Sequence, residues 1–245
     1  MVAGLALALA CAPTVAMAQD GGVTGSVELT TDQRRRGLSW SEGKAALDAT
    51  MAVPVGQSFR LEGRAATTRG SARHGGADVA LDGSAQLEQR LGGWTVTAGA
   101  TGHVFVGNGG SGLGYVEVGA GAGYLIGPAQ LDLAVDYAPD QRAIGGDNFY
   151  LSARTSVGIP TTPWTLRAHV GRSSGSVDDP FRAARLRPGG RYVDWGLGVE
   201  RVQGPLAIGV RYAGNDIAED RIIASPFADR RNSGDRVTAH VALVF

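Results

Sequence analysis

Residues 129–138 read AQLDLAVDYA. Every second position from Leu131 to Tyr137 is apolar, and the carboxylates of Asp132 and Asp136 stand between these positions. A side-chain period of two is typical of a β-strand whose two faces meet different surroundings. The stretch therefore predicts a strand with one apolar face and one polar, charged face.

The same alternation recurs along the chain, with turn residues between the segments. After residue 18 no long segment has a helical period, and no apolar run is long enough for a membrane-spanning helix. We therefore expect an all-β fold of about twelve strands. The predicted strands are 23–32, 44–53, 59–68, 77–91, 94–106, 115–126, 129–138, 148–159, 164–171, 192–201, 205–213 and 236–245.

The connections between these segments alternate in length. The short ones are 54–58, 92–93, 127–128, 160–163 and 202–205, and the long ones are 33–43, 69–76, 107–114, 139–147, 172–191 and 214–235. An even number of strands with short turns at one end and long loops at the other is typical of an outer-membrane β-barrel. The pattern predicts a transmembrane antiparallel barrel in the bacterial outer membrane.

The two faces of the predicted strands differ in charge. In a membrane barrel the apolar positions face lipid and the charged positions face the lumen, so we expect no charged side chain on the apolar face. A soluble barrel or sandwich would show the same alternation with the apolar face turned inward. Alternation alone does not separate these two folds.

The aromatic residues favour the membrane barrel. Phe59, Trp94 and Trp164 open strands directly after short turns, and Tyr124 and Phe245 close strands at the same end. All five stand in the apolar phase, which is where an aromatic girdle at the periplasmic interface is expected. In a soluble core, large aromatic residues would more naturally lie in the middle of a strand.

Both ends of the chain fit an exported barrel. Residues 2–17 are uncharged and largely apolar, and they lead to Ala16-Met17-Ala18. This predicts a signal peptide over residues 1–18 and a mature barrel over residues 19–245. At the other end, the apolar phase closes on Phe245, which resembles the terminal strand that the barrel-assembly machinery recognises, and we expect that partner.

Composition excludes several classes of protein. Basic and acidic residues number 23 each, so the chain lacks the positive excess of a general nucleic-acid binder. Its single cysteine, Cys11, falls in the predicted signal peptide, which excludes a disulfide framework or a cysteine zinc cluster in the mature chain. The four histidines show no metal-binding spacing, and we expect neither metal nor cofactor.

The segment TTDQRRRGLSWS, residues 30–41, contains an Arg-Gly-x-Ser-x-Ser element formed by Arg36, Gly37, Ser39 and Ser41. It resembles the signature that links the first two strands in the TorF-type family of proteobacterial outer-membrane porins. Length, strand pattern and the final Phe are similar as well. The resemblance implies a small barrel that acts as a pore, without naming a solute.

Two interpretations of this element stay open. It is either a hydrogen-bonded first extracellular hairpin, with Gly37 at a turn position of positive φ, or a continuation of the first strand. A continued strand would point Asp32, Arg34 and Arg36 into the lumen near the outer mouth. Guanidinium groups there would favour anionic solutes.

Three other motifs are weaker. The G-x-G-x-x-G match at 107–112 lies between two strands, so we expect a flexible outer loop rather than a dinucleotide site. The G-x-S-x-G match at 171–175 places Ser173 near His169, which leaves a lipid esterase at the rim as a remote alternative. A basic run in the fifth long loop is expected to be solvated and to contact lipopolysaccharide phosphates, although an infolded constriction is the alternative. The run comprises Arg182, Arg185, Arg187 and Arg191.

The preferred function is a pore for passive diffusion of small hydrophilic solutes, with a further expectation that these are anionic. The alternative from another class is a structural or adhesive barrel with a closed lumen that acts through its outer loops. The predicted pore-lining residues are Arg34, Arg36, Arg60, Glu62, Arg64, Asp82, Glu117, Asp132, Arg154, Arg167 and Arg211.

Overall fold

A computed structural model describes residues 22–245 of the chain. The predicted signal peptide, residues 1–18, and its cleavage site lie outside the described residues. None of the helices within 22–245 is long and apolar enough to cross a membrane.

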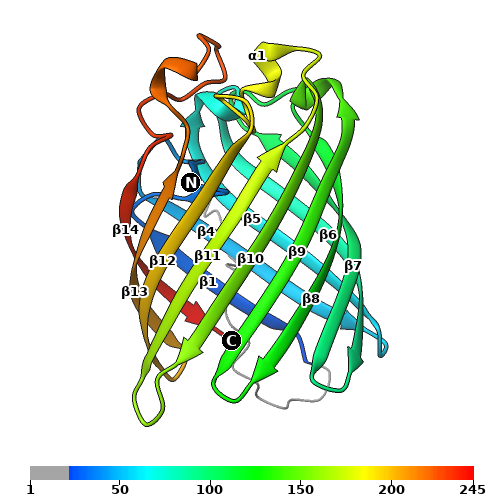
Figure 1. The fold of residues 1–245 in the computed structure, drawn as a ribbon, viewed down its shortest axis with the longest axis vertical. Coiled ribbons are helices and arrows are strands. Elements are labelled where there is room, and N and C mark those ends of the chain that lie inside the picture. The colour runs from blue at the N-terminus through cyan, green and yellow to red at the C-terminus, as the bar shows by residue number, and fades with distance from the viewer. Residues whose placement is uncertain (1–21) are drawn as a thin grey trace, which may run out of the picture.

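Twelve antiparallel strands close into one barrel, each pairing with its neighbour along the chain (Figure 1). The ring closes where β1 pairs with β14, and the backbone N–H of Gly25 donates to the Phe245 carbonyl at 2.6 Å beyond the last paired residues. The strands are β1 (Thr24–Thr30), β4 (Ala46–Val55), β5 (Phe59–Ser71), β6 (Ala77–Leu91), β7 (Trp94–Val106), β8 (Tyr115–Ile126), β9 (Ala129–Gln141), β10 (Gly146–Gly158), β11 (Trp164–Ser174), β12 (Tyr192–Gln203), β13 (Leu206–Asn215) and β14 (Arg236–Val244). The predicted number of strands and their pairing are confirmed.

The two ends of the barrel differ as the loop lengths predicted. Short turns lie at the lower end in Figure 1, and the long loops cover the upper end. These loops contain the short helices η1 (Ala72–His74), η2 (Arg142–Ile144), α1 (Pro180–Ala183) and η3 (Glu219–Arg221). We refer to the two ends as the turn end and the mouth.

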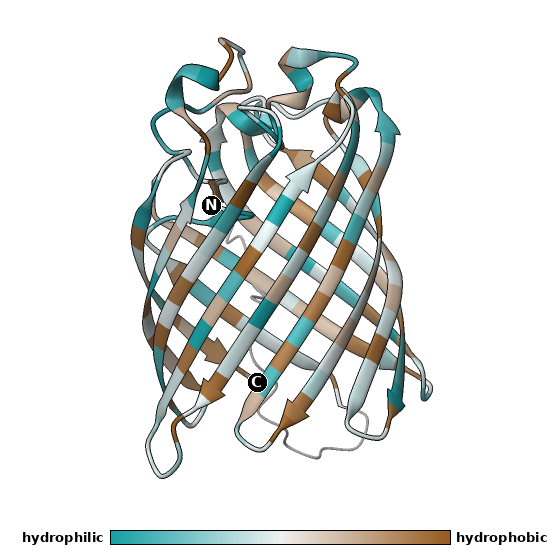
Figure 2. Ribbon diagram, viewed as in Figure 1, coloured by the Kyte–Doolittle hydropathy of each residue, from teal (hydrophilic) through white to brown (hydrophobic). Residues whose placement is uncertain are grey.

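The outer surface is apolar, because large hydrophobic side chains in one phase of the strands are exposed. Figure 2 shows brown bands alternating with paler and teal bands along the strands. Leu131 and Leu133 on β9 are 44% and 48% exposed. The prediction of an uncharged outer face is wrong at Arg201, which lies opposite Trp164 and Ile208 in the register and shares their outward phase. Arg172, near the mouth of β11, lies opposite Leu151 and Val193 and is outward as well. Arg201 lies close to the turn end of β12, where a long side chain can extend its charge to the interface.

The five predicted girdle residues lie at the turn end of their strands. Phe59, Trp94, Trp164 and Phe245 are exposed, and the Trp94 ring lies 4.7 Å from the ring of Tyr124 on the neighbouring strand. An interfacial role for these side chains remains a prediction.

One element has no counterpart among the predicted strands. Strands β2 (Arg34–Arg35) and β3 (Leu38–Ser39) form a small sheet of their own within the connection between β1 and β4. We call residues 32–41 the first-loop hairpin.

Candidate functional site

A single carboxylate organises the first-loop hairpin. Asp32 Oδ1 accepts hydrogen bonds from the hydroxyls of Ser39 (2.5 Å) and Ser41 (3.1 Å), and Asp32 Oδ2 accepts one from Arg34 at 3.1 Å. The turn consists of Arg36 and Gly37, whose φ values of 51° and 73° suit a two-residue hairpin turn. The Arg-Gly-x-Ser-x-Ser element therefore contributes both the turn and the two serines that fix it.

The hairpin folds into the lumen and binds the barrel wall with its arginines. Arg35 donates to Asp82 on β6 at 3.1 Å. Arg36 makes a two-pronged contact with Glu117 on β8 at 2.8 and 2.9 Å and lies 3.4 Å from Asp136 on β9. The hairpin is thus hydrogen-bonded, as the first interpretation required, and its charges lie in the lumen, as the second required.

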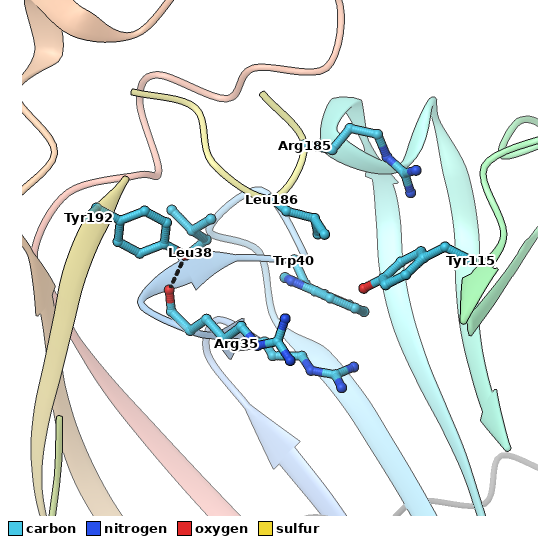
Figure 3. Close-up of a pocket in the computed structure, with 8 residues that line it drawn as sticks. Arg35, Leu38, Trp40, Tyr115, Arg185, Leu186 and Tyr192 are labelled. Atoms are coloured by element: carbon cyan, nitrogen blue, oxygen red, sulfur yellow. Dashed lines mark hydrogen bonds between the residues drawn. The ribbon is translucent and has the colours of Figure 1, made fainter. Parts of the chain in front are cut away.

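Aromatic and apolar side chains complete the fit of the hairpin (Figure 3). The Tyr192 hydroxyl donates to the Arg36 carbonyl at 2.9 Å, and the Arg36 guanidinium lies 4.4 Å from the Tyr150 ring. Leu38 and Trp40 are 2% and 3% exposed. A cavity of about 10 Å³ beside them has room for about one water molecule. The hairpin therefore packs tightly within the outer part of the lumen.

Two buried arginines hold the mouth loops together. Arg185 donates to the carbonyls of Arg73 (3.0 Å), Leu113 (2.9 Å) and Ala143. Arg73 donates in return to the Arg185 carbonyl and, at 3.2 Å, to the carbonyl of Ser39 in the hairpin. Burial without a carboxylate partner lowers the pKa of both arginines to about 10.

This arrangement corrects the prediction of a solvated basic run. Arg185 and Arg187 are 0% and 4% exposed, because backbone carbonyls of neighbouring loops accept their hydrogen bonds. Only Arg182 and Arg191 keep access to solvent. A contact of these two with lipopolysaccharide phosphates stays a prediction.

The wall facing the hairpin carries a continuous network of charged groups. Arg64 on β5 bridges Asp48 and Asp82, with an Nη1–Oδ2 distance of 2.9 Å to the latter. His103 lies between two carboxylates, 2.6 Å from Asp82 and 3.4 Å from Glu117. The network joins strands β4 to β8 and includes both wall partners of Arg35 and Arg36.

A second network lies on strands β11 to β14 and on β1, and it adjoins the first network where Glu28 on β1 pairs in register with Asp48 on β4. Glu200 on β12 binds Arg167 at 2.9 Å, Arg211 at 3.0 Å and His240 at 2.9 Å. Arg211 also contacts Glu28 on β1 at 2.8 Å. These ion pairs cross-link the strands on both sides of the seam where the barrel closes.

The predicted pore-lining residues divide into two groups. The side chains of the first group are at most 16% exposed and belong either to the hairpin or to the wall network that binds it: Arg34, Arg36, Arg64, Asp82 and Glu117. The second group lies nearer the turn end and keeps solvent access: Arg60, Glu62, Asp132, Arg154, Arg167 and Arg211. Among residues 22–245, Arg154 is exposed and has no ion-pair partner within 4 Å.

Several residues of the site were absent from the predicted set. Extending the phase of the first strand assigned Arg34 and Arg36 to the lumen and omitted Arg35, because it took no account of the turn at Arg36-Gly37. The inward phase of the strands was the available signal for five further residues: Glu28, Asp48, His103, Glu200 and His240.

The esterase alternative is not supported by the positions of its two residues. His169 and Ser173 stand four residues apart on β11, about 13 Å along an extended strand. Ser173 donates to Asn148 at 3.0 Å, and His169 lies 3.3 Å from Asp194. Within the described chain no group of histidines and carboxylates has the geometry of a metal site.

A closed antiparallel barrel with an apolar exterior and a charged interior has the architecture of an outer-membrane β-barrel. Its fold is similar to that of the NanC porin (11% identity, TM-score 0.59, 90% of this chain and 98% of that chain). It is also similar to the KdgM porin (6% identity, TM-score 0.55, 91% of this chain and 98% of that chain). A third similar structure is the COG4313 outer membrane channel from Pseudomonas putida F1 (11% identity, TM-score 0.55, 92% of this chain and 96% of that chain).

The chain belongs to the family described as a bacterial protein of unknown function, Gcw_chp, whose sequence model matches residues 16–245. No curated protein matches the sequence. The match assigns the chain to this family, and its membership of the TorF-type family stays a prediction.

Proposed function

We propose that this protein is an outer-membrane pore for the passive diffusion of small hydrophilic solutes, with the first-loop hairpin as its constriction. The observation that carries the proposal is the combination of a lipid-facing apolar wall with a charged lumen. Near the turn end, that lumen keeps accessible groups such as Arg60, Glu62 and Arg154. Solved relatives of the fold named as porins or channels, and the TorF-like signature of the hairpin, support the same function.

The expectation of anionic solutes rested on free guanidinium groups at Arg34 and Arg36. Both groups have carboxylate partners, Asp32 and Glu117, so they do not form a free cationic ring. The proposal accordingly covers small hydrophilic solutes without a preference for anions.

A closed structural barrel is the second candidate, and the tight packing of the hairpin favours it. Single-channel recording in planar bilayers separates the two functions. We compare the purified folded protein with a variant in which residues 34–39 are replaced by a two-glycine turn. As a control, the exposed segment Glu219–Arg221 is replaced by Gly-Ser-Gly.

A pore constricted by the hairpin should give current steps that become larger when the hairpin is shortened. The Glu219–Arg221 replacement should leave the steps unchanged. Absence of steps from every one of these proteins would overturn the pore and establish the closed barrel.

A further inference from the structure

Two arginines stand in the outward, lipid-facing phase of neighbouring strands, at opposite ends of the barrel. Arg172 lies near the mouth on β11, and Arg201 lies near the turn end of β12, opposite Trp164. Both arginines are exposed. Within the described chain, neither guanidinium group has a carboxylate within 4 Å. A charge on the lipid face is costly at the bilayer midplane and tolerated at the interface, so the height of each arginine matters.

The separation of the two arginines matches the height of the apolar layer of a membrane. Arg172 is eight residues from Trp164, the register partner of Arg201. Eight residues of a strand span about 26 Å, and a strand tilt of about 35–45° reduces this to about 20 Å along the membrane normal. The apolar band of an outer-membrane barrel is about 25 Å tall, so both charges reach its borders by extending their long side chains away from its centre.

The surface between the two arginines is apolar and has a tryptophan near each border. At the turn end, Trp164 lies opposite Arg201. Near the mouth, Trp195 lies opposite Val170, which is two residues from Arg172. Tryptophan is enriched at membrane–water interfaces, so its positions place both arginines at the level of the lipid headgroups. The exposed outward side chains of this strip include Leu166, Val170 and Leu197.

Carboxylates near Arg172 at the mouth are bound to other groups. Asp147 accepts hydrogen bonds from the backbone N–H and the hydroxyl of Ser176 at 2.5 and 2.9 Å. Asp216 accepts one from the backbone N–H of Val193 at 2.7 Å, on the strand that pairs with Arg172. Arg172 therefore keeps its donors for a group outside the chain.

We infer that Arg172 is a binding site for a phosphate of lipopolysaccharide. The long loops of outer-membrane barrels are extracellular, so the mouth lies at the outer leaflet, which consists of lipopolysaccharide. The phosphates of its lipid A portion lie directly above the acyl chains, at the level that Arg172 reaches. A planar guanidinium with several donors suits a phosphate group.

The opposite border of the strip faces a different lipid. Arg201 lies at the periplasmic leaflet, where the phosphates belong to glycerophospholipids. The outer wall is the same in a pore and in a closed barrel, so lipid binding at Arg172 does not depend on the proposed function.

The test is the binding of bisphosphorylated lipid A to the purified folded protein in neutral detergent, measured by native mass spectrometry over a lipid titration. Arg172→Gln should weaken the affinity about fivefold, the effect of one arginine at an anionic membrane surface. Arg172→Lys keeps the charge and should retain most of the affinity. The matched control is Arg221→Gln, which removes the same charge from the exposed η3 in a mouth loop and should leave the affinity unchanged.

Lipid A without phosphate groups and phosphatidylglycerol identify the group that is bound. Without the phosphates, the natural protein and Arg172→Gln should bind lipid A equally. Equal losses of lipid A and phosphatidylglycerol in Arg172→Gln would show a contact with phospholipid phosphates in general and overturn the assignment to lipopolysaccharide. An unchanged lipid A affinity in Arg172→Gln, or an equal loss in Arg221→Gln, would overturn the site itself.

Discussion

The contact between Arg36 and Glu117 should be among the strongest single couplings in the barrel. Its side chains are 11% and 4% exposed, and two N–H···O contacts join them at 2.8 and 2.9 Å. Removing one partner of a buried ion pair costs about 3–5 kcal/mol, because the other charge stays buried. We expect Arg36→Met and Glu117→Gln each to lower the free energy of unfolding by about 3 kcal/mol. Asp136 and His103 remain as partial partners, so the coupling should be about 2 kcal/mol.

The pair Arg60–Glu62 provides the matched control. Its atoms approach only to 3.7 Å, and its side chains are 33% and 29% exposed. Solvent screening limits such a pair to less than about 1 kcal/mol. Double-mutant cycles on both pairs are measured by urea unfolding of protein folded into phospholipid vesicles, followed by tryptophan fluorescence. Equal coupling energies in the two cycles would refute the placement of the hairpin against the wall.

Three other predictions concern the hairpin and the mouth. Gly37→Ala should cost about 1 kcal/mol more in the same unfolding assay than Gly56→Ala. Both glycines have positive φ, but only a Cβ at Gly37 meets a neighbour, Asp194. Arg185→Met removes donors to three loop carbonyls and should speed cleavage of the mouth loops by proteinase K at least tenfold, with the strands intact. Burial, together with the nearby charges of Arg185 and Arg73, lowers the pKa of His74. Below pH 6.5 the unfolded chain therefore binds a proton at His74 that the folded chain does not bind. Stability should therefore fall by up to about 1.4 kcal/mol per pH unit below 6.5, and His74→Phe should remove that slope; an unchanged slope would contradict it.

The strands were predictable because the information for them is local. A strand between lipid and lumen needs a side-chain period of two, and that period is legible without any knowledge of its neighbours. For β6, β7 and β8 the predicted bounds coincide with the observed ones. The differences elsewhere occur mainly at the mouth, where β5, β9 and β11 continue beyond the apolar band and the alternation gives way to small and polar residues.

The contents of the lumen were less predictable because their partners are distant in sequence. Arg35 donates to Asp82 and Arg36 donates to Glu117, and each carboxylate lies at least two barrel strands further along the chain. The burial of Arg185 depends on backbone carbonyl oxygens from three other loops. Every residue has a backbone carbonyl, so the sequence does not indicate which of them will accept a hydrogen bond from Arg185. The signature around Arg36 and Gly37 marked the right segment. Its direction, into the barrel rather than outward, follows from the carboxylates that receive it.

The use of arginine over lysine follows from what these positions must do. The chain has 22 arginines and a single lysine, Lys44, which lies exposed and contacts Glu42 at 2.9 Å and the Arg69 carbonyl at 3.4 Å. Arg64 and Arg211 each bridge two carboxylates on different strands, and Arg185 reaches carbonyls of three loops. A planar guanidinium with five donors can make such contacts at once, whereas an ammonium group is a compact point charge. A lysine in place of Arg36 would therefore keep the positive charge and lose the two-pronged contact with Glu117 that holds the hairpin against the wall.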